Sequence, residues 1–214
     1  SKVWNKKIFK NIQEKVDLAS KNLAEERGAC PDAEEYGIKE RFSNKTAIAP
    51  TASISIICGG SSPGVEPIAA NSFTHKTLSG SFNVRNKYLK KVLHKYNKDN
   101  DEVWSSITTN QGSISHLDFL TSDEKDTFKT AFEIDQRWII ELGADRTPHI
   151  SQAQSINVFV PADIHKKELH DIHFQAWKKG LKSLYYCRSK SIQRAENVQA
   201  GSSTDVTKNV YSKE

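Results

Sequence analysis

The chain has 214 residues, and 31 Lys or Arg against 26 Asp or Glu give a formal net charge of +5 at neutral pH. A hydrophobic content of 36% is enough for a folded core, and no apolar run approaches the roughly 20 residues that cross a bilayer. The mild, interspersed charge argues against a nucleic-acid partner, and three widely separated cysteines exclude a disulfide framework. These features predict a soluble, cytoplasmic protein with buried free thiols.

The first element is an amphipathic helix predicted over residues 2–27, followed by the stop signals Gly28 and Pro31. Apolar residues recur along it at helical spacing and predict one apolar face; they are Ile8, Ile12, Val16, Ala19 and Leu23. Further on, the short apolar segment 46–49 predicts a buried strand that ends at Pro50.

Residues 51–58 allow two interpretations, because their β-branched content fits a strand and a short helix equally well. A helix here would point free N–H groups outward, and the hydroxyls of Thr51, Ser53 and Ser55 would add donors for an anion. The plainer alternative is a Thr- and Ser-rich strand, or a capped helix, that binds nothing.

The middle of the chain predicts a hairpin of residues 73–78 and 82–85 around Ser79-Gly80, and then helices over 86–96, 101–109 and 122–132. In the final third, helical residues 133–142 precede a strand at 155–160, a helix at 163–179 and a strand at 181–187. Strand, helix, strand at this spacing predicts a βαβ unit with parallel strands.

Tyr185 and Tyr186 stand next to each other in the last predicted strand, so their side chains are expected on opposite faces. The usual outcome is that one packs in a core and the other forms a hydrogen bond at the surface. His165, His170 and His173 are expected to be solvated, because no third ligand stands at metal-binding spacing.

Several long motifs, in one collinear order, change these expectations. They are residues 23–32, 41–55, 64–67, 77–82, 131–138, 152–157 and 180–186. In this order they resemble the large, catalytic subunit of class I ribonucleotide reductase, and the resemblance extends from about Trp4 to Asn197. It implies an α/β fold, the C-terminal part of the reductase ten-stranded α/β barrel over residues 1–197, followed by a flexible tail at 198–214.

The resemblance also implies roles for particular residues. In the family, a Pro-Thr-Ala-Ser segment opens a helix that holds the substrate diphosphate, which favours the helical interpretation. The matching residues, with the neighbouring serine, are Thr51, Ala52, Ser53, Ile54 and Ser55. The adjacent tyrosines of the family relay a radical, which places Tyr185 on the side of the catalytic cysteine and Tyr186 on the side of the partner subunit.

The chain departs from the family pattern in its cysteines. The family motif Asn-x-Cys-x-Glu, which carries the radical cysteine, does not occur in this sequence, and neither does the C-terminal cysteine pair that accepts reducing equivalents. We therefore expect a C-terminal fragment or split-gene component of ribonucleoside-diphosphate reductase that is inactive alone. The alternative is a non-catalytic paralogue that docks on reductase subunits as a binding or regulatory module.

The resemblance implies partners as well. They are the N-terminal remainder of the large subunit, a radical-generating small subunit and a ribonucleoside diphosphate, with deoxyribonucleotides for DNA replication as the product. We expect this chain itself to bind no metal or cofactor. The radical would come from the metal-containing small subunit, and the electrons from thioredoxin or glutaredoxin.

Overall fold

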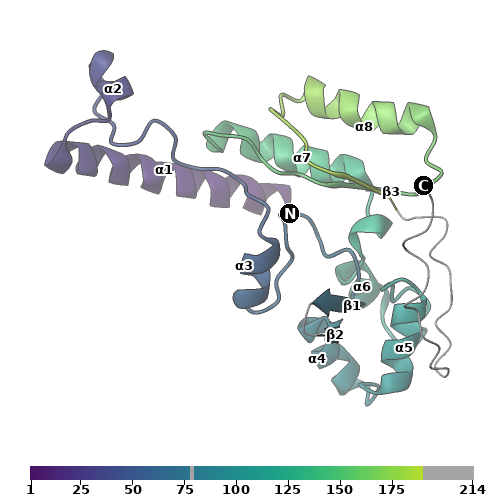
Figure 1. Cartoon of the computed structure of the whole chain (residues 1–214). Helices are drawn as coiled ribbons and strands as arrows, with labels where there is room; N and C mark the ends of the chain where they lie inside the picture. The colour runs from purple at the N-terminus through teal and green to yellow at the C-terminus, as the bar shows by residue number, and fades with distance from the viewer. Residues whose placement is uncertain (78–79, 190–214) are drawn as a thin grey trace, which may run out of the picture.

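The computed structural model describes residues 1–77 and 80–189 (Figure 1). Its elements, in chain order, are α1 (Lys2–Arg27), α2 (Pro31–Glu35), α3 (Ala52–Ile57), β1 (Ser72–Thr77), β2 (Gly80–Arg85), α4 (Lys87–Lys95), α5 (Asp101–Thr109), α6 (Ser122–Thr127), η1 (Ala131–Glu133), α7 (Gln136–Arg146), η2 (Thr147–His149), β3 (Val158–Val160), α8 (Lys166–Lys178) and β4 (Cys187–Ser189). The described strands form two two-stranded sheets and do not close a barrel. The predicted tail, 198–214, lies outside the described residues.

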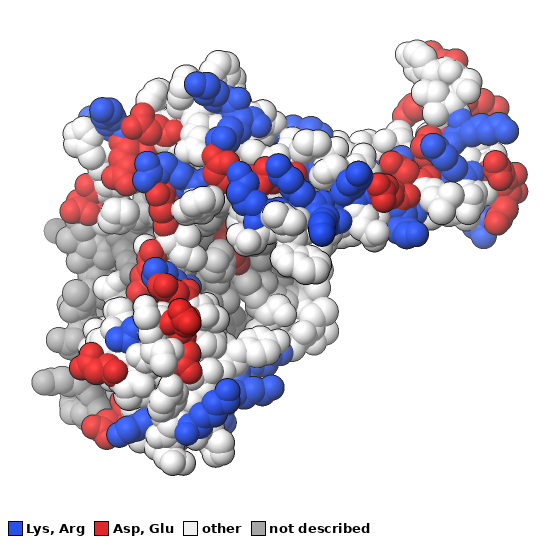
Figure 2. Space-filling view, turned by 180° about the vertical axis from the view of Figure 1, so that it is seen from behind, with Lys and Arg blue, Asp and Glu red and all other residues white. Residues whose placement is uncertain are grey.

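The long helix α1 has the predicted bounds and lies beside α7, beyond which it extends as an arm (Figure 1). The side chain of Asn5 donates a hydrogen bond to the Leu142 carbonyl at 3.0 Å, so the contact between the two helices is partly polar. The apolar residues Ile8 and Ile12 are exposed. Basic and acidic side chains alternate over the arm in Figure 2, which agrees with the interspersed charge of the sequence.

One hydrophobic cluster joins α4, α5 and the loop that follows α5. Its buried members are Leu89, Leu93, Trp104, Ile107, Ile114, Leu117 and Leu120. The antiparallel hairpin β1–β2, with Ser72 paired to Arg85, lies against α5 and confirms the hairpin prediction. Its turn residues, 78–79, lie outside the described part of the chain.

A second cluster joins α7, β3 and α8, and its buried members are Ile140, Val158, Val160, Ile172 and Ala176. Strands β3 and β4 are parallel, with Val158 paired to Cys187, and α8 connects them. The predicted βαβ unit is therefore confirmed. Strand β3 is shorter than predicted. Strand β4 shares only Cys187 with the predicted strand 181–187, because it begins after the two tyrosines.

Two helix boundaries differ from prediction because of local capping. Helix α6 ends at Thr127 rather than continuing to residue 132, since Thr130 and Glu133 form a new capping box that starts η1. Helix α7 begins after Asp135, whose side chain accepts a hydrogen bond from the Arg137 amide. The predicted strand 46–49 is reduced to a single parallel bridge between residues 48 and 154.

The prediction of buried thiols is wrong for the two cysteines outside the first loop. Cys58 is exposed because it caps the C-terminal end of the short helix α3, and Cys187 is exposed because all of β4 faces outward. Cys30 is half-buried. The three histidines of the α8 region are exposed, as expected, and no cluster of potential metal ligands occurs among the described residues.

The described helices differ from membrane-spanning helices in length or in charge. Helix α1 is the longest of them, at 26 residues, but charged side chains recur along its whole length. Within the described part of the chain, no helix combines the length and the apolar character that crossing a bilayer requires.

Candidate functional site

The segment 51–55 forms the start of helix α3, as the resemblance implied. Thr51 is the residue before the helix, and its amide and its hydroxyl both donate to the Pro63 carbonyl, at 2.9 and 3.1 Å. The Thr51 side chain therefore does not cap the helix. It attaches the start of α3 to the loop 58–66, which fixes the position of the first turn.

The next three residues, Ala52, Ser53 and Ile54, are exposed. They lie in the first turn, where backbone N–H groups have no partner within the helix. Ser55 differs, because it is buried and its hydroxyl donates to the Ala52 carbonyl at 2.8 Å. The segment thus presents amides and the Ser53 hydroxyl outward, while Ser55 braces the turn from inside.

The two tyrosines lie just before β4, and their rings meet instead of pointing to opposite faces. The ring centroids of Tyr185 and Tyr186 are 4.1 Å apart and the ring planes are inclined by 52°. Both rings are about half-exposed. The expectation of opposite faces is therefore wrong, and the contact is tilted rather than parallel.

The phenols of the pair interact. A side-chain hydrogen bond to Tyr186 raises the pKa of Tyr185, and the charge interaction with Tyr186 acts in the same direction. The guanidinium of Arg188 opposes the shift and lies 5.2 Å from the centre of the Tyr186 ring. The pair is thus two interacting phenols in ring contact, with a cation beside the second ring.

One segment, residues 153–160, connects the two candidate regions. On one side Ile48, which leads into α3, pairs with Gln154; on the other Val158 pairs with Cys187, and both pairings are parallel. If both registers are continued by residue, residue 51 on one side and residue 186 on the other stand opposite residue 157. The tyrosine backbone is held to this segment by hydrogen bonds from the Tyr185 amide to the Ile156 carbonyl and from the Val158 amide to the Tyr186 carbonyl, at 2.8 and 2.9 Å.

Sequence analysis predicted no role for two residues that lie between the two candidate regions. The side-chain oxygen of Asn157 accepts a hydrogen bond from the Tyr186 backbone amide at 3.4 Å. The backbone amide of Asn157 donates a hydrogen bond to the carboxylate of Glu66. Glu66 is buried, although it stands in a loop. The sequence holds one indication of this role. Glu66 is an acidic residue in the short run 64–67, between glycine and proline, and a buried acidic side chain is unusual.

A buried arginine supports the same segment from behind. The Nε of Arg146 donates to the side-chain oxygen of Gln154 at 3.0 Å, and its Nη1 donates to Asn5 at 3.3 Å. Burial lowers the pKa of Arg146, while the negative charges of Glu66 and Asp145 oppose that shift. Helices α1 and α7 are therefore tied to the segment that lies between the two candidate regions.

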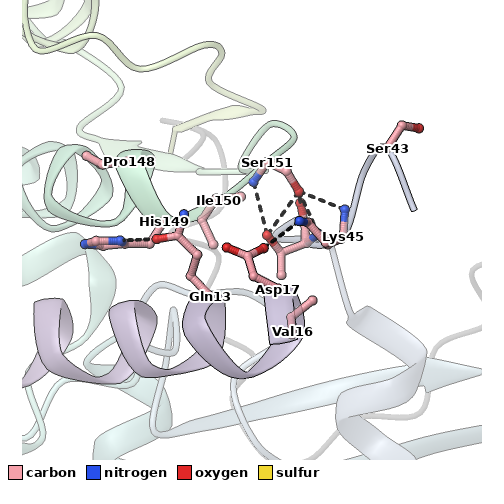
Figure 3. Close-up of a pocket in the computed structure, with 10 residues that line it drawn as sticks. Gln13, Val16, Asp17, Ser43, Lys45, Pro148, His149, Ile150 and Ser151 are labelled. Atoms are coloured by element: carbon pink, nitrogen blue, oxygen red, sulfur yellow. Dashed lines mark hydrogen bonds and ion pairs between the residues drawn. The ribbon is translucent and has the colours of Figure 1, made fainter. Parts of the chain in front are cut away.

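A separate surface cavity of about 270 Å³ lies between α1 and the residues around η2 (Figure 3). Burial acts to lower the pKa of Lys45, but its ion pairs with Asp17 at 2.6 Å and Glu40 at 3.3 Å outweigh burial and raise it. The Nδ1 atom of His149 forms a hydrogen bond with the side-chain oxygen of Gln13 at 2.7 Å. None of the residues predicted for substrate or radical chemistry lines this cavity.

Comparison with known proteins adds a family match and several relatives. The family model described as "Ribonucleotide reductase, barrel domain" matches residues 5–187, a range that includes both candidate regions. The ribonucleoside-diphosphate reductase large subunit of Invertebrate iridescent virus 6 is 48% identical over 197 residues, which are 90% of this chain and 20% of the relative. The large subunit of Invertebrate iridescent virus 3 is 44% identical over 203 residues, 94% of this chain and 32% of the relative.

The fold has a match among solved structures. The alpha subunit of the Actinobacillus ureae class Id ribonucleotide reductase superposes with a TM-score of 0.80 at 38% sequence identity, over 89% of this chain and 34% of that chain. The chain thus spans a fifth to a third of the length of these relatives.

Proposed function

The chain belongs to the family of ribonucleotide reductase barrel domains, and from this we propose that it acts as the C-terminal part of the large subunit of a ribonucleoside-diphosphate reductase. Completed by the N-terminal remainder and by a radical-generating small subunit, it would reduce ribonucleoside diphosphates to their deoxy forms for DNA synthesis. Its own contributions are a binding segment for the substrate diphosphate and a tyrosine relay.

The contact between Tyr185 and Tyr186 is the observation that carries this proposal. Their ring centroids lie 4.1 Å apart, and the interaction between the two phenols raises the pKa of Tyr185. A relay requires that each phenol in turn lose one electron and one proton and then regain both. Ring contact provides a route for the electron, and the adjacent phenols would pass the proton between them.

Diphosphate binding is supported by the exposed first turn of α3. Its outward amides and the Ser53 hydroxyl are donors of the type that bind phosphate oxygens. No acidic side chain stands in this turn to repel an anion. The Thr51 and Ser55 hydroxyls bond to carbonyl oxygens, so we assign them to shaping the turn.

The remaining chemistry is assigned to other parts of the enzyme. The sequence contains no Asn-x-Cys-x-Glu motif, so the radical cysteine would belong to the N-terminal remainder. The small subunit would supply the radical from its metal centre, and thioredoxin or glutaredoxin would supply the electrons. The chain by itself is therefore expected to give no turnover.

The relay is tested with Tyr185→Phe and Tyr186→Phe in an enzyme co-expressed with an N-terminal remainder and a small subunit. Phenylalanine keeps the packing area but cannot be oxidised with loss of a phenolic proton. We expect assembly and diphosphate binding to persist while deoxyribonucleotide formation is lost. Tyr36→Phe is the matched control, since Tyr36 is exposed and distant in sequence.

Two results would count against parts of this proposal. Substantial turnover in either tyrosine variant would remove the relay from it. An assembled parent enzyme that binds its partner subunits without any turnover would favour the alternative, a docking module without catalytic activity.

A further inference from the structure

The carboxylate of Glu66 is the least expected group in the loop after α3. The residue is 5% exposed, and burying a carboxylate is costly unless it accepts hydrogen bonds. Its Oε1 accepts a hydrogen bond from the backbone amide of Asn157. Its backbone carbonyl accepts a hydrogen bond from the Ser62 hydroxyl at 2.6 Å. Glu66 is therefore held at its main chain by Ser62 of the same loop and at its side chain by Asn157.

Gly64 leaves the space that this carboxylate occupies. A Cβ atom built on Gly64 would lie 2.2 Å from Oε2 of Glu66, a separation that real Cβ atoms do not show. Gly64 has no positive φ angle, so its requirement for glycine comes from this contact and not from its backbone conformation. An added methyl group at residue 64 would displace the Glu66 carboxylate.

The contacts of Glu66 continue in both directions along the candidate site. Toward the tyrosines, Asn157 accepts the Tyr186 amide through its side chain at 3.4 Å. Toward α3, the carbonyl of Pro63 accepts both donors of Thr51. The loop 62–66 thus touches the start of α3 and, through Asn157, the backbone of the tyrosine pair.

We propose that Glu66 is a positioning residue, which holds Asn157 and thereby fixes the Tyr185–Tyr186 pair relative to the start of α3. Its value for catalysis rests on the proposed function, but the geometric claim does not. Without the carboxylate, the backbone amide of Asn157 loses its acceptor, and the Asn157 side chain is no longer directed at Tyr186. The ring contact between the tyrosines should then loosen while α3 and β3 persist.

The test compares three variants of the full chain labelled with fluorotyrosine. Glu66→Ala removes the acceptor, Glu66→Gln keeps an acceptor oxygen without the charge, and Gly64→Ala displaces an intact carboxylate. Fluorine NMR reports the ring contact, and the signals are assigned with Tyr185→Phe and Tyr186→Phe. Tyr36, which is 75% exposed, serves as the internal reference, and Glu34→Ala, at a glutamate in α2, is the matched control.

We expect Glu66→Ala and Gly64→Ala to move the signals of residues 185 and 186 toward that of Tyr36, with far-UV circular dichroism unchanged. Glu66→Gln and Glu34→Ala should keep the parent shifts. The proposal is overturned if folded Glu66→Ala or Gly64→Ala keeps the parent shifts, or if Glu66→Gln loses them as fully as alanine does.

The completed enzyme separates this proposal from the proposed function. If Glu66→Ala moves the tyrosine signals and also lowers kcat with little change in KM, both proposals are supported. If the signals move and turnover is unchanged, positioning by Glu66 stands and the relay fails. If turnover falls but the signals do not move, the relay remains and the positioning role of Glu66 is rejected.

Discussion

At the scale of single residues, the phenol of Tyr185 offers a direct measurement of the tyrosine contact. Its pKa is raised mainly by the hydrogen bond to Tyr186, because the bond is available to the protonated phenol and is lost on ionisation. We expect Tyr186→Phe to lower the pKa of Tyr185, as measured by the absorbance of phenolate during alkaline titration. An unchanged midpoint would show that the two phenols are not bonded in solution.

The sign of the corresponding stability effect follows from the raised pKa. The favourable contribution of the Tyr185 hydrogen bond is complete below the pKa of an unfolded tyrosine. It is lost as the pH rises through the higher pKa of the folded chain. Since Tyr185 is about half-exposed, solvent screens the interaction, and the titration is a more sensitive measurement than unfolding.

Arg146 is the residue where a single substitution should destabilise the chain most clearly. Arg146→Met keeps an apolar stem beside Phe9 but removes the donors to Gln154 and Asn5. Leaving buried acceptors unpaired costs about 1 to 3 kcal/mol, and we expect a loss of that size in urea unfolding. Arg137→Met is the control, because Arg137 is an exposed partner of Asp135, and such a pair contributes at most about 1 kcal/mol. Equal losses in the two variants would contradict this assignment.

At the scale of elements, the cap of α4 joins a helix to the rest of its cluster. The side chain of Asn86 accepts hydrogen bonds from the amides of Tyr88 and Leu89 and donates to buried Asn71. Replacing such a cap with alanine costs about 0.5 to 2 kcal/mol, so Asn86→Ala should lower the thermal unfolding midpoint. Ser1→Ala should not, because Ser1 precedes α1 without forming a capping hydrogen bond. A midpoint for Asn86→Ala equal to that of the parent would show that the cap does not stabilise the chain.

The elements also show how far a sequence can predict this molecule. Helix α1, the hairpin and the βαβ unit follow from local periodicity, turn residues and strand spacing, and all three were predicted. The short strand expected at 46–49 failed because its pairing depends on Gln154, which is far away in the chain. Strand propensity cannot reveal whether such a distant partner is adjacent.

The candidate site divides in the same way. The helical start of α3 and the importance of adjacent tyrosines came from the resemblance to a family, while alternation in a strand predicted the wrong geometry for the rings. Glu66 and Asn157 were missed because their roles arise from one hydrogen bond, between a backbone amide and a side-chain carboxylate, in residues 91 positions apart. No local pattern encodes a contact of that kind.

At the scale of the whole molecule, ion pairs fasten the start of α1 to α7 and the end of α8 to α7. Lys2 contacts Glu141 at 3.2 Å and Asp145 at 3.6 Å, and Lys179 contacts Glu141 at 2.6 Å. The hydrogen bond from Lys179, followed by that from Lys2, lowers the pKa of Glu141. The start of α1 is thus attached partly through ion pairs that salt and acid weaken.

We expect the attachment of α1 to weaken in acid. A carboxylate with a lowered pKa contributes stability that is present above the unfolded pKa and is lost as the pH falls through the folded one. Amide hydrogen exchange in the first turns of α1 should therefore accelerate as the pH falls through the carboxylate range, after correction for the intrinsic rate. Lys2→Ala should accelerate exchange at neutral pH, whereas Lys10→Ala, whose ion pair with Glu14 lies within α1, should not. Exchange that does not respond to Lys2→Ala would refute the role of these ion pairs.

The joining of residues 45–48 to residues 151–155 has a consequence for the order in which the chain folds. The Ser151 hydroxyl accepts the amides of Lys45 and Thr46, at 2.9 and 2.8 Å, across separations of more than 100 residues. Contacts this distant in sequence close large loops and form late. During synthesis, the entrance to α3 therefore waits for the last third of the chain to emerge, and a nascent chain that stops before Ser151 lacks the contacts that seat the segment 51–55.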